Sequence, residues 1–240
     1  MTSCYSLQNI TFGYGQTPIL QVDALDIAAG ELVFVIGESG IGKSTFLEGI
    51  GLMSSTVMPL SPEARFAIMG EERDIPAAWR DQGPLLHEIR RGTFSFIFQN
   101  TNLLSNLNIR ENVLMASMNE EGWDEDRFQS LLAKLDLDAA IADRLPGHIS
   151  GGQRQRVAFI RAMMTSFSIL LADEPTGNLD PENSKLLFSA LQQDLKTQGK
   201  TAVIVSHHLE LAHAFADRIL LISRAEGSEI STLTEQTVAP

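Results

Sequence analysis

Short apolar segments recur along the chain, and each has the composition of a strand that is buried on both faces. Their Ile, Leu, Val and Phe character is continuous, without the alternation of a strand that has one wet face. Helical patterns lie between several of them, including STFLEGIGLM at residues 44–53 and ENSKLLFSALQQDLK at residues 182–196. This alternation predicts an α/β fold with a mostly parallel sheet. The predicted strands are residues 32–36, 93–98, 168–172, 202–206 and 218–222.

Other parts of the chain depart from this alternation. Residues 1–31 and ARFAIMG at residues 64–70 alternate between apolar and polar positions, which predicts a small antiparallel flank. Residues 101–150 carry three helical patterns with no strand between them and predict an inserted helical lobe. The patterns are IRENVLMASM at residues 109–118, DEDRFQSLLAKL at residues 124–135 and LDAAIADRL at residues 137–145. The expected divisions of one domain, residues 1–240, are the core with its flank at 1–100 and 151–225, the lobe at 101–150, and a polar, partly loose tail at 226–240.

Charge and composition narrow the classes of function. The chain has 18 basic and 30 acidic residues, a net charge of −12, so we expect no nucleic-acid partner, which would need a basic stripe. The single cysteine, Cys4, allows no disulfide within the chain and favours a reducing compartment. The first residues, MTSCYSLQNI, lack the features of a secretion signal. No apolar run reaches the roughly 18 residues that span a bilayer, so any role at a membrane needs another chain to cross it.

The first candidate site is a glycine-rich stretch, GESGIGKST, between a predicted strand and a predicted helix. It matches G-x-x-x-x-G-K-[ST], in which backbone N–H groups and a helix N-terminus surround phosphate oxygens. Lys43 can reach the β- and γ-phosphates, and the Ser44 hydroxyl can bind Mg²⁺. The alternative is an ordinary glycine-rich turn. The predicted nucleotide-binding residues are Gly37, Glu38, Ser39, Gly40, Ile41, Gly42, Lys43, Ser44 and Thr45.

The second candidate site is SILLADEPTGNLD at residues 168–180, an apolar strand that ends in two carboxylates. After such a strand, Asp173 is placed to hold Mg²⁺, and Glu174 could accept a proton from an attacking water. The alternative is a solvated strand end that begins a turn. Asp180 stands before Pro181, which predicts a helix N-cap followed by proline at the first helical position.

A third stretch, ISGGQRQRVAFIRAMM at residues 149–164, predicts a helix that begins after Ser150. Ser150 can cap this helix, while Gly151 and Gly152 leave its N-terminus open toward an anion. The alternative is a capped helix with a loose start.

The order of these elements, from phosphate loop through helical lobe and S-G-G-Q to acidic strand, resembles the ATP-binding cassette (ABC) ATPases over nearly the whole chain. ISGGQ resembles the family signature, with Ile149 where leucine is commoner. The resemblance implies ATP and Mg²⁺ as ligands and a homodimer in which two copies pair head to tail. Each ATP would then lie between the phosphate loop of one copy and the signature of the other. The signature residues serving the partner's ATP would be Ser150, Gly151, Gly152 and Gln153.

The same resemblance implies further roles. Tyr14 in ITFGYG resembles the aromatic residue that stacks on adenine, although it could be an ordinary strand aromatic, and Phe12 is an alternative. Gln99 resembles the glutamine that meets Mg²⁺ and links the core to the lobe, although its position also suits a polar strand end.

Glu174 matches the general base, and Asp180 matches the loop that crosses to the partner subunit. His207 in VIVSHH matches the histidine that senses the γ-phosphate. The family often has an acidic residue after that histidine, whereas this chain has His208. Strand alternation would send His207 and His208 to opposite faces, and the offset from the strand favours His207.

Two stretches, FIFQNTNLLSNLNIRENV at residues 96–113 and DEPTGNLD at residues 173–180, resemble the lipoprotein-releasing, macrolide-exporting and cell-division group. Amino-acid importers share parts of both. Residues 54–92 resemble this group least. They could be a loop with its own contact surface or a tolerated insertion. The group implies an ATPase on the cytoplasmic side of the cell membrane that drives a separate multi-span membrane subunit, for export, extraction of lipoprotein or other substrate, or mechanical transmission. The alternatives are an ATP-driven regulator of an envelope enzyme, an importer-type ATPase and a soluble standalone ABC ATPase.

Overall fold

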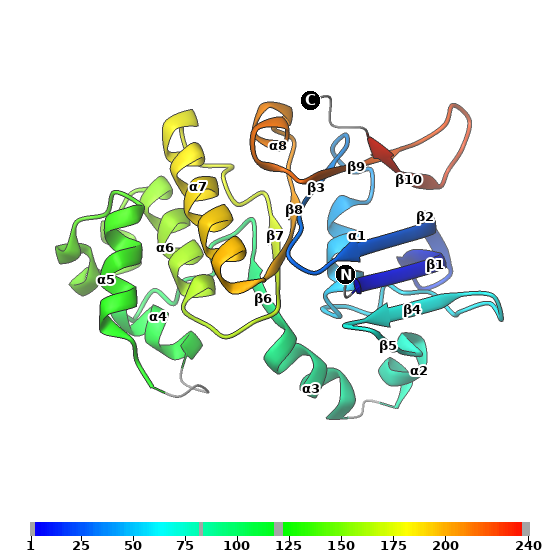
Figure 1. Ribbon diagram of the computed structural model, residues 1–240, viewed down its shortest axis with the longest axis horizontal. Coiled ribbons are helices and arrows are strands. Elements are labelled where there is room, and N and C mark those ends of the chain that lie inside the picture. The colour runs from blue at the N-terminus through cyan, green and yellow to red at the C-terminus, as the bar shows by residue number, and fades with distance from the viewer. Residues whose placement is uncertain (1–2, 82–83, 118–121, 237–240) are drawn as a thin grey trace.

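One ten-stranded sheet runs through the computed structural model, which describes residues 3–81, 84–117 and 122–236 (Figure 1). Its strand order is β5-β4-β1-β2-β10-β9-β3-β8-β7-β6. The strands from β9 to β6 pair in parallel, and those from β5 to β2 pair antiparallel. The predicted α/β fold with a mostly parallel core is therefore confirmed. The strands are β1 Ser3–Tyr14, β2 Thr17–Ala28, β3 Leu32–Ile36, β4 Arg65–Ile68, β5 Glu71–Glu72, β6 Phe94–Ile97, β7 Ile169–Asp173, β8 Thr201–Val205, β9 Arg218–Ser223 and β10 Ser231–Gln236.

Helices cover both faces of the parallel strands (Figure 1). None of the described helices combines the length and the apolar character that a bilayer crossing requires. The α-helices are α1 Lys43–Ile50, α2 Ile75–Arg80, α3 Pro84–Thr93, α4 Ile109–Ser117, α5 Glu125–Lys134, α6 Gly151–Met163, α7 Pro181–Gln198 and α8 Leu209–Phe215, and the 3₁₀ helices are η1 Ala139–Asp143 and η2 Pro146–His148.

Strand β3 explains why the core segments are continuously apolar. Phe34 packs into a cluster that includes side chains of α5, α6 and α7, while its neighbours Val33 and Val35 pack into a second cluster with α1, β1 and β2. All five residues of β3 are buried, so neither face has a polar position. The two clusters place α6 and α1 on opposite faces of the parallel strands (Figure 1).

The antiparallel flank contains the predicted strand of residues 64–70. Strand β4 pairs antiparallel with β1, with Tyr5 opposite Ile68 and Leu7 opposite Phe66. Residues 54–92 are not a long loop, because their described part folds into β4, β5, α2 and α3.

The three helical patterns of residues 101–150 correspond to α4, α5 and η1. Met118, the last residue of the first pattern, lies outside the described residues. The third pattern forms a 3₁₀ helix and not an α-helix, with Asp138 accepting a hydrogen bond from the backbone of Ala140. The segment is short and Pro146 follows closely, which favours the tighter helix.

The polar tail holds a strand that we did not expect. Strand β10 pairs antiparallel with β9 and parallel with β2 at Ser231 and Thr232, so it joins the parallel core to the antiparallel flank. Residues 237–240 of the tail lie outside the described part of the chain. The sequence signal was weak because Leu233 is the only apolar residue of β10 and Ser231 its only buried one.

Candidate active site

The glycine-rich stretch forms a loop between β3 and α1 that only glycine permits at two positions. A Cβ on Gly37 would lie 2.5 Å from the carbonyl oxygen of Ile222, so a side chain there would collide with the backbone. Gly42 has a φ of 112° and is the N-cap of α1. The cap makes no side-chain hydrogen bond, and the first turn of α1 carries no acidic residue. The amides at this helix end are therefore left to an anion, which suits a phosphate group.

The Lys43 ammonium lies across this loop. Its Nζ donates hydrogen bonds to the carbonyl oxygens of Gly37 and Glu38, both at 2.8 Å. These contacts hold a positive charge beside the uncapped amides of α1. The loop thus presents a cation and backbone donors to one place, as binding of a polyphosphate requires.

Ser44 and Asp173 bring two oxygen ligands together from sequence positions far apart. The Ser44 hydroxyl donates a 2.9 Å hydrogen bond to Asp173 Oδ2 at the end of β7. Burial raises the pKa of Asp173, the Ser44 hydrogen bond opposes that rise, and the charge of Glu174 adds to it. A hydroxyl and a half-buried carboxylate are ligands that Mg²⁺ accepts, so these residues fit that ion. No hydrogen bond among the described residues joins Gln99 to either group, and its magnesium role stays a prediction.

Glu174 occupies a strained position beside this pair. Its φ is +49°, a left-handed value that is uncommon for a residue with a side chain and that clusters at functional sites. Its N–H donates to the carbonyl of Val205 at 2.9 Å, which anchors it to the end of β8. Its side chain is 14% exposed, and Oε2 lies 2.9 Å from Nδ1 of His207. Within the described part of the chain, this buried Oε2 receives no hydrogen bond of standard geometry, so it keeps acceptor capacity for a proton.

The two histidines do not lie on opposite faces, so the expectation from strand alternation is wrong. Their ring centroids are 3.9 Å apart with planes tilted by 40°. Strand β8 ends at Val205, and the alternation ends with it. His208 is the N-cap residue of α8, and its N–H donates to Ser206 Oγ. His207 is the histidine that faces Glu174.

In the antiparallel flank, Phe12 and Tyr14, the two candidates for stacking on adenine, differ in exposure. Phe12 is fully buried and packs edge-on against Phe46, with ring centroids 5.5 Å apart. Tyr14 is 49% exposed, and its hydroxyl donates to Glu48 Oε2 at 3.1 Å. Partial burial raises the pKa of Tyr14, so its hydroxyl stays protonated at neutral pH. Tyr14 therefore has a ring available for stacking and Phe12 does not.

The predicted caps of α6 and α7 are confirmed. Ser150 Oγ accepts a hydrogen bond from the Gln153 N–H at 3.2 Å, and Gln153 Oε1 accepts one from the Ser150 N–H at 2.9 Å. Asp180 accepts the N–H of Asn183 at 2.9 Å, and this backbone hydrogen bond lowers the pKa of Asp180. Both helix starts are therefore ordered by local side chains.

The chain brings Lys43, Ser44 and Asp173 together, but its own signature segment lies apart from them. Helix α6, which begins after Ser150, packs on the opposite face of the parallel strands from α1 (Figure 1). The starts of α1 and α6 therefore do not form one site within a single copy. Motif spacing also overlooked Gln155, a buried glutamine on α6 whose side chain bonds to the loop after Asp173. Its burial could not be read from the polar face of the predicted helix.

Known proteins match this arrangement at the level of sequence. The family described as ABC transporter matches residues 20–177. The lipoprotein-releasing system ATP-binding protein LolD of Myxococcus xanthus (strain DK1622) is 36% identical over 219 residues, which cover 89% of this chain and 90% of that protein. The macrolide export ATP-binding/permease protein MacB of Pasteurella multocida (strain Pm70) is 36% identical over 228 residues, which cover 92% of this chain. The chain spans only 33% of the length of that MacB.

Solved structures agree over almost the full length. The dimeric structure of MJ0796, a bacterial ABC transporter cassette, has a TM-score of 0.79 at 30% identity and covers 98% of this chain and 99% of that one. A post-hydrolysis dimer of MJ0796 bound to ADP and Pi has a TM-score of 0.75 at 29% identity, with the same coverage of both chains. Together with the phosphate loop and the acidic strand end, these matches show that the chain belongs to the ABC transporter family and is an ABC ATPase.

Proposed function

We propose that this chain is the ATP-hydrolysing subunit of an ABC transporter-type complex, in which two copies close head to tail on two ATP molecules and drive a separate membrane subunit. The observation that supports this most is the position of Lys43 and Ser150 on helix starts at opposite faces of the sheet. One copy therefore holds two half sites that its own fold keeps apart, and a second copy can supply the missing half of each. The related cassette MJ0796 has been solved as a dimer.

Within this proposal, each group has a defined task. Residues 37–45 bind the phosphates, Tyr14 stacks on adenine, and Ser44, Asp173 and Gln99 hold Mg²⁺, which neutralises charge on the phosphate oxygens when bound. The partner-facing residues are Ser150, Gly151, Gly152 and Gln153 of the signature and Asp180 of the crossing loop.

Hydrolysis needs one proton removed from the attacking water. Glu174 Oε2 is the acceptor, since it is buried and lies 2.9 Å from His207 Nδ1. His207, which is half exposed, can turn from Glu174 toward the γ-phosphate. Most of the rate enhancement then comes from position and charge, because phosphoryl transfer asks for little covalent chemistry from the protein.

Mixing two inactive variants tests the head-to-tail dimer. Lys43→Ala disables the phosphate loop of one copy, and Ser150→Arg disables the signature of the other. A mixed dimer then contains one composite site with both wild-type halves, and ATP hydrolysis should reappear on mixing. Each variant alone is the control. Hydrolysis that stays absent, although mixed dimers form on ATP, would reject the composite site.

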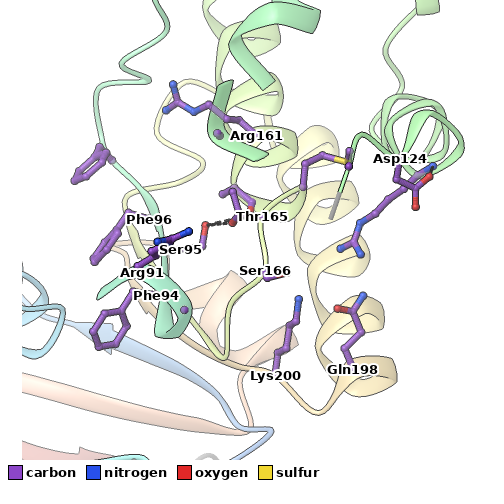
Figure 2. A pocket seen from close by; sticks show the side chains of 17 residues that line it. Arg91, Phe94, Ser95, Phe96, Asp124, Arg161, Thr165, Ser166, Gln198 and Lys200 are labelled. Carbon is purple, nitrogen blue, oxygen red and sulfur yellow. Dashed lines mark hydrogen bonds between the residues drawn. The ribbon is translucent and has the colours of Figure 1, made fainter. Parts of the chain in front are cut away.

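A groove of about 830 Å³ between core and helical lobe is the proposed seat of the membrane subunit (Figure 2). Phe94 and Phe96 line one side of it, and Arg91, Arg161 and Lys200 lie around it. The hydrogen bond from Thr165 Oγ1 to Ser95 Oγ, 3.1 Å long, joins the end of α6 to β6 inside the groove. The lining has four basic side chains and one acidic side chain, in a chain of net charge −12. A short helix with apolar and acidic side chains fits this groove.

The groove lies beside α6, and this position supports a mechanical role. Closure of the dimer on ATP would move the helical lobe, which forms one wall of the groove. The relatives named LolD and MacB support export, extraction of lipoprotein or other substrate, or mechanical transmission as the work done. The chain would then lie on the cytoplasmic side of the cell membrane, held there by its partner.

Co-purification in the native cell tests the partner. Tagged Glu174→Gln, extracted in mild detergent with ATP, should retain a multi-span membrane protein in near-equal amount. Adding Arg91→Glu should reduce that protein severalfold, because it reverses a charge in the groove. Arg80→Glu, an exposed position on α2, is the control. A soluble homodimer without any membrane protein would favour a standalone ABC ATPase, and a partner whose loss alters only a cell-wall enzyme would favour regulation.

A further inference from the structure

The side chain of Gln155 joins the signature helix to the loop that carries the proposed base. Gln155 lies on α6 and is 1% exposed. Its Nε2 donates to the carbonyl oxygen of Glu174 at 3.0 Å, and its Oε1 accepts from the N–H of Asn178 at 2.9 Å. Both ends of one buried amide are therefore used by the loop of residues 174–178.

The loop itself is compact and has a second anchor on the sheet. The Gly177 N–H donates to the carbonyl of Glu174 at 3.1 Å, so that carbonyl accepts from both the loop and Gln155. The Glu174 N–H donates to Val205 on β8 at 2.9 Å. One peptide group of the loop is thus held by the sheet and the next by α6.

The start of α6 also packs directly on this loop. A Cβ on Gly152 would lie 3.3 Å from the carbonyl oxygen of Asn178, which leaves no room for a larger residue without a shift. Glu174 keeps a φ of +49°, and a conformation of this kind persists only where the surroundings hold it. Gln155 supplies such a hold on the carbonyl side of Glu174.

We propose that Gln155 is a positioning residue that makes α6 and the loop of Glu174 one mechanical unit. The inference rests on the proposed function, because Ser150 at the start of α6 would contact the partner's ATP. Binding of that ATP would then determine where the base of this copy stands, through Gln155 and over a single turn of helix. Each active site would thereby sense whether the neighbouring site is filled.

Gln155→Met tests the unit, because it keeps the length of the side chain and removes both hydrogen bonds. It should lower kcat roughly 10- to 100-fold, since a displacement of about 1 Å at the base has an effect of that order. The Kd for ATP should stay within about twofold, because the phosphate loop on the other face is untouched. Gln192→Met is the matched control, as Gln192 Nε2 donates to the carbonyl of Phe215 at 3.2 Å, away from the loop.

A second variant separates an effect on the position of Glu174 from an effect on folding. Thermal melts show which of the variants fold. Gln155→Asn keeps the amide but shortens its reach by one methylene, so it should also lower kcat and leave Kd unchanged. It decides the question if Gln155→Met does not fold. A folded Gln155 variant with kcat within about threefold of wild type would overturn the inference, as would a variant that weakens ATP binding and kcat equally.

Failure of this inference is distinguishable from failure of the proposed function. Wild-type hydrolysis that depends on Lys43, together with recovery in the Lys43→Ala and Ser150→Arg mixture, supports the composite site independently of Gln155. If those two results hold and Gln155→Met has a normal kcat, only the proposed coupling of α6 to the loop of Glu174 is rejected.

Discussion

Glu174 Oε2 lies 2.9 Å from Nδ1 of His207, across the carboxyl ends of the neighbouring strands β7 and β8. Glu174 is mostly buried, with 14% of its side chain exposed, whereas His207 is 58% exposed. The contact therefore joins a mostly buried acceptor to an exposed side chain. Under the proposed function, His207 would leave Glu174 for the γ-phosphate, as a nucleotide-dependent switch requires.

Glu174→Gln tests the fixed partner in this pair. The amide has nearly the same shape but cannot take a proton from water, so kcat should fall roughly 100-fold or more. ATP binding should persist, and the variant should form an ATP-dependent dimer on size-exclusion chromatography. Glu182→Gln, at the exposed start of α7, is the control. Wild-type hydrolysis by Glu174→Gln would show that another group is the base.

Lys43→Ala tests the phosphate loop. Its ammonium is held by the carbonyls of Gly37 and Glu38, and no other cation stands on that loop, residues 37–45. Loss of the charge should weaken ATP binding at least tenfold, measured by fluorescence of a labelled nucleotide, and abolish hydrolysis. Lys185→Ala, exposed on α7, should change neither. Undiminished ATPase activity in Lys43→Ala would contradict the phosphate-loop assignment.

Asp173→Asn should stabilise the ligand-free protein while abolishing Mg²⁺-dependent hydrolysis. The pKa of Asp173 is raised mainly by burial, so the folded state binds the proton more tightly than the unfolded chain does. Ionisation therefore lowers the free energy of unfolding as pH rises through the ordinary and then the raised pKa. Asparagine avoids this loss and can still accept from Ser44.

Thermal melts in EDTA measure this effect. The advantage of Asp173→Asn should be largest at about pH 7 and should vanish as the pH falls below the ordinary aspartate pKa of about 3.9, where the carboxyl is neutral in both the folded and the unfolded state. Each kcal/mol corresponds to an increase of about 2–4 °C in Tm for a domain of this size. If Asp173→Asn melts at a lower temperature than wild type at neutral pH, the charge of Asp173 stabilises the fold.

Phe188→Ala tests the cluster that supports α7 on the sheet. Phe188 is fully buried, with its ring centroid 5.1 Å from that of Phe34 on β3 and 5.6 Å from that of Phe215. Its loss should lower the free energy of unfolding by about 3–5 kcal/mol in urea titration. Leu186→Ala, 38% exposed on the same helix, should lower it by less than about 1 kcal/mol. Equal losses in both variants would show that the buried cluster around Phe188 stabilises the fold no more than the exposed face of α7 does.

Much of the fold could be predicted because its signals are local. The strand at 32–36 has the predicted bounds, since an apolar run bounded by Gly30 and Gly37 leaves little freedom. The other core strands agree within a residue or two. The 3₁₀ type of the third lobe helix was not predicted, although a helix was expected there. Strand β10 was not predicted, because its polar sequence becomes a strand only through pairing with β9 and with β2, which is distant in sequence.

The sequence by itself determined the chemistry of this protein: a phosphate loop with Lys43, an acidic strand end with Asp173 and Glu174, and a capped helix after Ser150. These motifs are local, and turn geometry, helix capping and charge act over a few residues. Tertiary structure decided which of them meet. It placed Ser44 against Asp173, His207 against Glu174, and α6 on the face away from α1. Only the order of strands in the sheet determines those distances, because it joins Ser44 to Asp173, 129 residues away, and sets the strand ends of Glu174 and His207 side by side.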